Sequence, residues 1–77
     1  MFQWLKQKYE YHQEFKAVRD AVHILRGLYP NLGPTARSSL VQVVWDMVAV
    51  FGQKWNRPDV SEFYFQELNQ IVMRGGK

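Results

Sequence analysis

The stretch Leu40–Phe51, LVQVVWDMVAVF, is the most apolar run in the chain and decides its fold. A β-strand of this kind would be about 4–8 residues long, whereas the apolar pattern here continues from Ala36 to Trp55. On a helix, polar residues such as Asp46 fall on one narrow strip, and apolar residues cover well over half of the circumference. A surface helix usually has an apolar stripe only ~100° wide or somewhat wider. The pattern therefore predicts a central helix that is covered from two directions.

The segments on either side of this stretch are also predicted to be helical. The three helices are expected at about residues 2–28, 35–55 and 59–73. Pro34 is a typical first residue for the central helix, and Asp59 and Glu62 have the spacing of an N-cap residue and its N3 partner. The sequence predicts an all-α, three-helix bundle-like domain over residues 1–77, with a long first helix and a sandwiched apolar central helix.

The first helix carries an apolar seam and a second apolar patch near its N-terminus. The seam residues follow alternating spacings of four and three: Tyr11, Phe15, Val18, Val22, Leu25 and Tyr29. Trp4 continues this seam, whereas Phe2, Leu5 and Tyr9 fall on the opposite side. A helix of this length is roughly 40 Å long, against ~30 Å for the central helix, so one end should extend beyond the bundle. We interpret this end as a contact for a partner or a second copy; a frayed N-terminus is the alternative.

Length and composition limit the class of protein. A 77-residue chain buries only ~60–65% of its unfolded surface, so a second subunit would add needed stability. The absence of cysteine excludes disulfides and thiolate metal sites and fits a reducing compartment. The N-terminus carries charges where a secretion signal is apolar, and no stretch approaches the ~18–20 apolar residues of a membrane span. We expect a soluble, cytoplasmic protein.

The polar residues do not form a recognisable catalytic, cofactor or metal motif. His12 and His23 are about 16 Å apart along a helix, too far to share a metal ion. Asp20 and His23 have a spacing that brings two ligands together, but both point away from the seam, where a solvated pair is the simpler interpretation. The serines have no histidine at a predictable distance. We therefore expect no enzymatic activity, no cofactor and no small-molecule substrate.

The segment Leu32–Ser39, at the start of the central helix, is the best candidate for an anion site. A helix N-terminus presents free N–H groups, and Arg37 stands where the helix dipole disfavours a cation. A phosphate or an acidic group of a partner would offset that cost. The segment lacks the spacing of a phosphate-binding loop, so an ordinary helix start is the alternative.

These observations favour a non-enzymatic protein–protein interaction or regulatory module that acts as a homodimer. Phe63 falls off the apolar stripe of the third helix and joins the exposed aromatic set. The predicted partner-binding residues are Phe2, Trp4, Leu5, Tyr9 and Phe63, with Arg37 as a charged accessory.

Two other partners are considered for the first helix. The net charge of +3 is a mild excess, and the basic residues Lys6, Lys8, Lys16, Arg19 and Arg26 lie on this helix. Binding of nucleic acid through that basic side is the second hypothesis, although Glu10, Glu14 and Asp20 dilute the charge. A membrane surface is the least favoured partner, because Glu10 and Glu14 would oppose anionic lipid.

Overall fold

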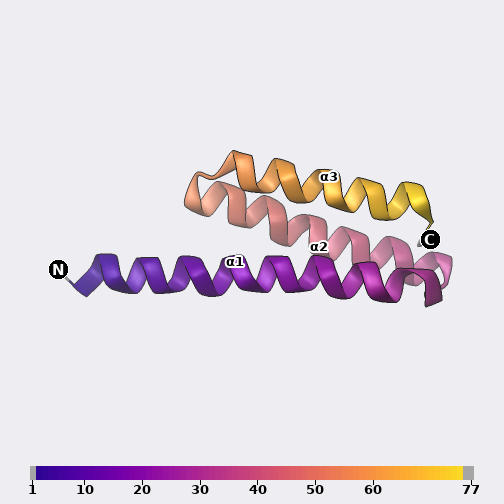
Figure 1. Cartoon of the computed structure of the whole chain (residues 1–77), viewed down its shortest axis with the longest axis horizontal. Helices are drawn as coiled ribbons and strands as arrows, with labels where there is room; N and C mark the ends of the chain where they lie inside the picture. Colours follow the sequence, from indigo (N-terminus) through magenta and orange to yellow (C-terminus); the bar gives the residue numbers. More distant parts are fainter. Residues whose placement is uncertain (1, 76–77) are drawn as a thin grey trace.

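The computed structural model describes residues 2–75, and their side chains from residue 3 onward. The elements are α1 (Phe2–Leu28), a 3₁₀ turn (Tyr29–Asn31), α2 (Pro34–Trp55) and α3 (Pro58–Arg74). Three helices pack against one another, and no strand occurs in the described part of the chain. The predicted all-α, three-helix bundle-like fold is confirmed (Figure 1).

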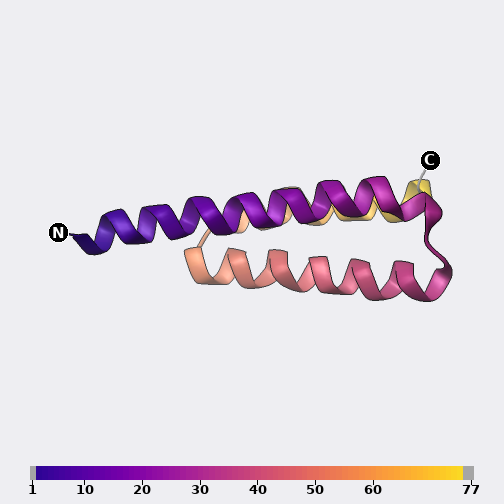
Figure 2. The same cartoon turned by 90° about the horizontal axis from the view of Figure 1, so that it is seen from below.

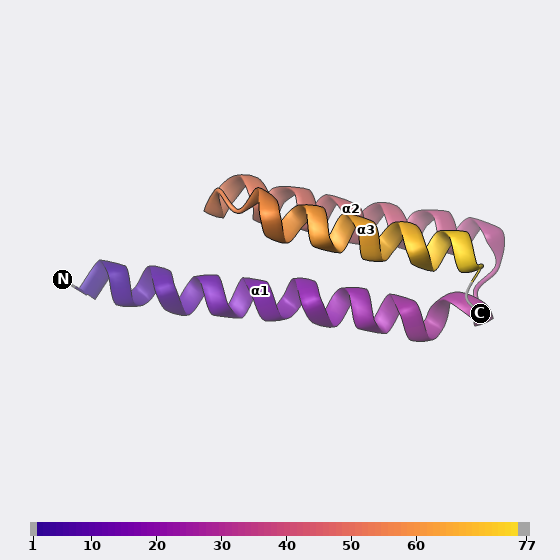
Figure 3. The ribbon, with the colours of Figure 1, turned by 45° about the horizontal axis from the view of Figure 1, so that its top comes forward.

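The three helices form an elongated bundle that measures 48 × 18 × 17 Å. α2 runs back along α1, and α3 runs back along α2, so each consecutive pair is antiparallel (Figures 1 and 2). The first turns of α1 extend beyond the α2–α3 turn (Figure 3), as the unequal helix lengths predict. We call residues 2–10 of α1 the N-terminal overhang, because Tyr11 is the first residue of the seam that packs against the core.

One core cluster joins all three helices. Its buried residues are Val18, Val22, Leu25, Tyr29, Val44, Val48, Phe51, Tyr64, Leu68 and Ile71. The seam residues Val18, Val22 and Leu25 of α1 and Tyr29 of the 3₁₀ turn are buried, while Tyr11 and Phe15 pack against the edge of the cluster. Aromatic contacts tie this edge to α2, since the Phe15 and Phe51 ring centroids are 6.0 Å apart. The apolar periodicity of α1 therefore identifies the surface on which the other helices pack.

α2 packs against both of its neighbours, which accounts for most of its wide apolar surface. Proline occupies its first turn, and the helix ends at Asn56, which adopts the left-handed conformation with φ 51°. Coverage from two sides leaves a third flank of the helix open. Val43 and Val50 on that flank are 55% and 63% exposed.

α3 corrects one detail of the sequence analysis. Its N-cap is Arg57 and proline follows at the start of the helix, so Asp59 lies inside the first turn instead of capping it. The Arg57 side chain caps none of the free backbone N–H groups of the helix; its guanidinium donates two hydrogen bonds of 3.1 Å to the Asp59 carboxylate. This ion pair lowers the pKa of Asp59. The predicted capping box of Asp59 and Glu62 is wrong, because Pro58 starts the helix one residue earlier.

Candidate interaction surface

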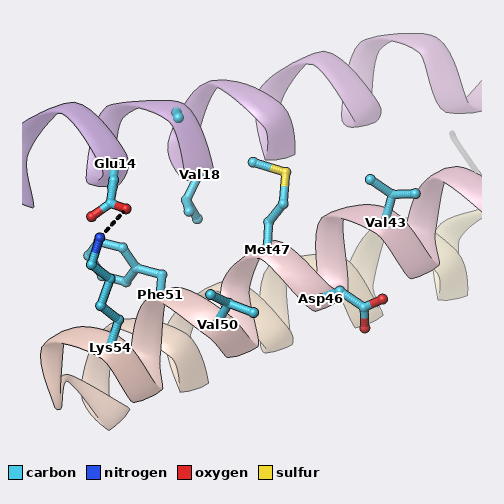
Figure 4. Close-up of a pocket in the computed structure, with 9 residues that line it drawn as sticks. Glu14, Val18, Val43, Asp46, Met47, Val50, Phe51 and Lys54 are labelled. Carbon is cyan, nitrogen blue, oxygen red and sulfur yellow. Dashed lines mark hydrogen bonds and ion pairs between the residues drawn. The ribbon is translucent and has the colours of Figure 1, made fainter.

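An apolar groove runs between α1 and α2 on the open flank of α2. Its volume is about 420 Å³. The groove is lined by Glu14, Ala17, Val18, Val43, Asp46, Met47, Val50, Phe51 and Lys54. In Figure 4, Glu14 and Val18 point from α1 toward α2, while Met47 and Phe51 rise from α2 to meet them. We call this feature the α1–α2 groove.

Two more exposed apolar residues lie on α1 beyond the lining of the groove. Ala17, Ile24 and Leu28 are separated by seven and four residues, a spacing that returns to the same side of α1. Ile24 and Leu28 are both exposed, as are Val43 and Val50 on α2. Monomeric proteins rarely leave a contiguous apolar patch of more than a few hundred Å² open to water. The flank is therefore a candidate interaction surface.

An ion pair closes the groove at the end nearest the overhang. Lys54 Nζ lies 2.8 Å from Glu14 Oε1, and Trp55 Nε1 donates a hydrogen bond of 2.7 Å to Glu14 Oε2. The hydrogen bond from Lys54 is the main cause of the lowered pKa of Glu14. Partial desolvation raises this pKa, and the hydrogen bond from Trp55 lowers it further. Glu14 stays ionised at neutral pH and is committed to this pair. It has a structural partner and is not poised for proton transfer.

A second carboxylate lines the groove from α2. Asp46, on α2, lines the groove and accepts a hydrogen bond of 2.9 Å from Gln42 Nε2. Asp20, on α1, lies near Ala17 but does not line the groove. Its nearest cation is Arg19, whose Nε lies 3.7 Å from Asp20 Oδ1. The groove lining thus carries two carboxylates, of Glu14 and Asp46, and the ammonium of Lys54, which pairs with Glu14.

The overhang presents the aromatic residues that the sequence analysis singled out. Trp4, Leu5 and Tyr9 are 59%, 51% and 65% exposed. The Lys8 ammonium lies 6.0 Å from the Trp4 ring centroid, and Gln13 donates a hydrogen bond of 2.8 Å to the Tyr9 hydroxyl. The predicted contact through the side chain of Phe2 lies outside the described residues. Partner binding by this end of α1 stays a prediction.

Phe63 is exposed but lies apart from the overhang. Its ring makes an edge contact with Tyr64, with centroids 5.1 Å apart, and it borders a small pocket with Arg19 and His23. Leu5 precedes Arg19 by fourteen residues, which is about 21 Å along α1. The structure therefore does not bring Phe63 and the overhang into one surface.

Arg37 directs its side chain toward the end of α1. Its Nε donates a hydrogen bond of 3.0 Å to the carbonyl oxygen of Tyr29, and its Nη2 donates one of 3.3 Å to that of Pro30. The guanidinium also lies over the Tyr29 ring, 4.6 Å from the centroid. These intramolecular contacts explain why Arg37 stands near the N-terminus of α2, and no bound anion is needed to account for it. A contact of Arg37 with a partner stays a prediction.

Two features of the described residues bear on other kinds of site. Between residues 2 and 75, no three histidine, aspartate or glutamate side chains come together as metal ligands. In the same range, every helix falls short of the combined length and hydropathy that crossing a bilayer requires.

The chain matches no protein-family model, and no detectably similar chain is found among curated proteins or solved structures.

The groove includes residues that sequence reasoning did not select as a site. Val43 and Val50 belong to the wide apolar side of the central helix, which the sequence pattern assigns to packing. The signal in the sequence was the apolar side of the central helix, which is wider than the stripe of a usual surface helix. In this bundle the two neighbouring helices leave part of that wide apolar surface, at Val43 and Val50, exposed.

Proposed function

We propose that this protein is a non-enzymatic interaction module that binds another protein through the α1–α2 groove and the N-terminal overhang. One observation carries the proposal: the groove is an apolar surface on ordered helices that stays open to solvent. Burying such a surface against a partner is favourable by about 25 cal/mol per Å² of apolar area. The cytoplasm, with its reducing conditions, is the proposed location, because the chain has no cysteine.

The nature of the lining residues supports binding over chemistry. Ala17, Met47 and Val50 offer no nucleophile or proton donor, and the carboxylate of Glu14 is held by Lys54 and Trp55. A surface of this kind fits the helix-in-groove mode, in which an amphipathic helix places apolar anchors between two helices. Binding by shape and apolar contact is therefore the activity that these groups support.

Nucleic-acid binding through the basic side of α1 is the second candidate and has weaker support. Arg26 forms an ion pair with Glu67 of α3, and Arg19 lies near Asp20. These contacts reduce the positive field that phosphate groups would meet. Salt-dependent binding of DNA or RNA at low ionic strength would favour this second candidate over the first.

Photo-crosslinking tests the proposed function directly. A photoreactive residue in place of Val50 is expected to give one discrete adduct in an extract of the native cell. The same residue in place of Gln66, which is exposed on α3 and does not line the groove, is the matched control and should give none. A Val50 variant that stays at the mass of the free chain would contradict the proposal.

Substitutions then show whether the adduct depends on the apolar surfaces. The double variant Leu5→Glu/Tyr9→Ser is expected to weaken association, while its helical content by circular dichroism stays nearly unchanged. Helical content should persist because both substituted side chains are more than half exposed. If this variant unfolds the free chain, the overhang contributes to folding and does not belong to the interaction surface.

A further inference from the structure

We infer that a second cavity, between α1 and α3, binds a phosphate group. This α1–α3 pocket has a volume of about 160 Å³. Its polar and aromatic lining residues are Arg19, His23, Arg26, Phe63, Tyr64 and Glu67. It shares no lining residue with the α1–α2 groove, so the inference goes beyond the proposed function and does not depend on it. Two observations carry it: a buried hydroxyl without a partner and an arginine whose donors are not used within the chain.

Tyr64 is the buried member of the lining. Its side chain is only 8% exposed, and its hydroxyl makes no hydrogen bond within residues 2–75. The hydroxyl of a buried tyrosine usually has a hydrogen-bond partner. In the described part of the chain, every side-chain nitrogen or oxygen atom that is sealed from solvent has one, so this hydroxyl is reached by solvent where Tyr64 lines the pocket.

The charges around this hydroxyl place it at the pocket. Burial raises the pKa of Tyr64, the charge of Arg19 lowers it, and the charge of Glu67 raises it. Arg19 and Glu67 both line the α1–α3 pocket. Because the pKa is raised, the hydroxyl stays protonated at neutral pH and can donate a hydrogen bond to an acceptor in the pocket.

Arg19 supplies positive charge and unused donors. Its Nε lies 3.7 Å from Asp20 Oδ1, which is beyond hydrogen-bond distance, and Asp20 does not line the pocket. By contrast, Arg26, Arg37 and Arg57 donate hydrogen bonds within the chain. A guanidinium presents a planar fork of N–H groups that matches the oxygen atoms of a phosphate. Arg19 is therefore the main phosphate-binding residue of the inferred site.

The size of the pocket and its donors match a single phosphate group. Pockets for drug-sized ligands have volumes of about 300–1,000 Å³, so this one admits one group and not a whole nucleotide. Its donors come from two helices, with Arg19 and His23 on α1 and Tyr64 on α3. A phosphate monoester has three acceptor oxygens and a charge of about −1.5 to −2 at pH 7. A carboxylate has two oxygens in one plane and satisfies fewer donors that approach from separate helices.

Two further lining residues bear on the ligand. Glu67 is the acid among the lining residues, and it forms an ion pair with Arg26. The lining holds two guanidinium groups against this one carboxylate, so one positive charge is left for an anion. Phe63 borders the pocket and is 54% exposed, so its ring is accessible to an apolar group that carries the phosphate.

Titration of the native chain followed by nuclear magnetic resonance tests the site. At pH 7 and constant ionic strength, phenyl phosphate and inorganic phosphate are each expected to shift the amide signals of Arg19, His23 and Phe63 in a saturable way. Tighter binding of phenyl phosphate identifies a monoester as the source of the phosphate, and equal binding identifies the free ion. Acetate is expected to bind about tenfold more weakly. Equal binding of acetate, or shifts that do not saturate, would overturn the inference.

A conservative variant tests the hydroxyl. Tyr64→Phe is expected to weaken phenyl phosphate binding about fivefold without lowering the free energy of unfolding, because the hydroxyl has no partner to lose within residues 2–75. Tyr11→Phe is the matched control, since it removes a hydroxyl that accepts a hydrogen bond from Arg57 outside the pocket. Unchanged binding by the Tyr64→Phe variant would overturn the role of this hydroxyl and with it the inference.

Charge variants test whether the phosphate binds in the pocket or in the general field of α1. Arg19→Gln is expected to weaken binding about tenfold, whereas Lys16→Gln removes the same charge from an exposed residue of α1 outside the pocket and should have little effect. Glu67→Gln is expected to strengthen binding, because it removes the acid from the lining and releases Arg26. Equal losses from Arg19→Gln and Lys16→Gln, or a loss from Glu67→Gln, would overturn the site.

Discussion

The two flanks of α2 have similar apolar composition, but one is packed against α3 and the other is open to solvent. On the α3 side, Trp45 and Phe65 stack with ring centroids 4.3 Å apart. On the α1 side, the groove leaves Val43 and Val50 more than half exposed. Apolar character alone therefore does not distinguish a residue that stabilises the bundle from one that is available to a partner.

The difference between the flanks follows from how closely the helices approach. At the α2–α3 contact, a Cβ atom built on Gly52 would lie 2.8 Å from the Cβ of Ser61, so the two backbones come together there. Between α1 and α2, the core contact is made by residues such as Val18 and Phe51, and the flank beside them stays open as the groove. One face of α2 is used for folding, and we propose that the other is used for binding.

The largest effect on stability is expected from replacing a valine by alanine, and it should differ between the two faces of α2. Val48 is fully buried, whereas Val50, two residues away, is 63% exposed. Val48→Ala is expected to lower the free energy of unfolding by about 2–3 kcal/mol through lost burial and a residual cavity. Val50→Ala should change it by a few tenths of a kcal/mol at most, because alanine is also the better helix former. Urea denaturation at low protein concentration measures both, and equal losses would contradict the assignment of the open flank.

A smaller effect is expected from glycine substitutions that probe the closeness of the helices. Gly52→Ala gains about 1 kcal/mol of helix propensity, but overpacking against Ser61 costs about 1–3 kcal/mol, so a net loss of stability is expected. Gly27→Ala is the matched control, because no other heavy atom lies within 4 Å of its added Cβ.

Thermal unfolding of the two glycine variants decides the point. Gly27→Ala should raise the melting temperature slightly, and Gly52→Ala should lower it. Combining Gly52→Ala with Ser61→Gly removes the clashing Cβ and is expected to recover part of the loss. If Gly52→Ala alone stabilises the chain, α2 and α3 do not approach as closely as the structure shows.

The smallest effect concerns the ion pair that closes the groove. The pKa of Glu14 is lowered from its ordinary value of 4.5 in the folded state. A lowered folded-state pKa stabilises the fold above the unfolded pKa, and this contribution is lost as the pH falls through the folded pKa. The pair is partly exposed, so it contributes less than about 1 kcal/mol.

Denaturation at two pH values checks this contribution. Glu14→Gln is expected to be less stable than the native chain at pH 7, and the difference should shrink as the pH falls below 4.5. Glu10→Gln makes the same charge change at a residue that forms no ion pair within residues 2–75. A pH-dependent loss of the same size in the Glu10→Gln variant would show that the Glu14–Lys54 pair contributes nothing specific.

Much of the helical architecture was predictable because its signals are local. The predicted helices at residues 2–28, 35–55 and 59–73 lie within one residue of the observed ends, since Pro34 and Pro58 mark two helix starts and Gly75 follows the last helix. The exposed apolar character of Leu5 and Tyr9 was readable for the same reason. The candidate site was only partly predictable, because exposure of Val43, Val50 and Ile24 depends on where the other helices lie.

The sequence by itself determined that three helices form, where each begins and ends, and that α1 is longer than its neighbours, because apolar periodicity and proline and glycine positions act within a few residues. Only the tertiary structure decided which flank of α2 receives α3 and which stays open, because interhelical distances depend on packing across the whole bundle. It also gave Arg37 its partners at Tyr29 and Pro30. Those contacts join residues from different elements, and no local pattern encodes them.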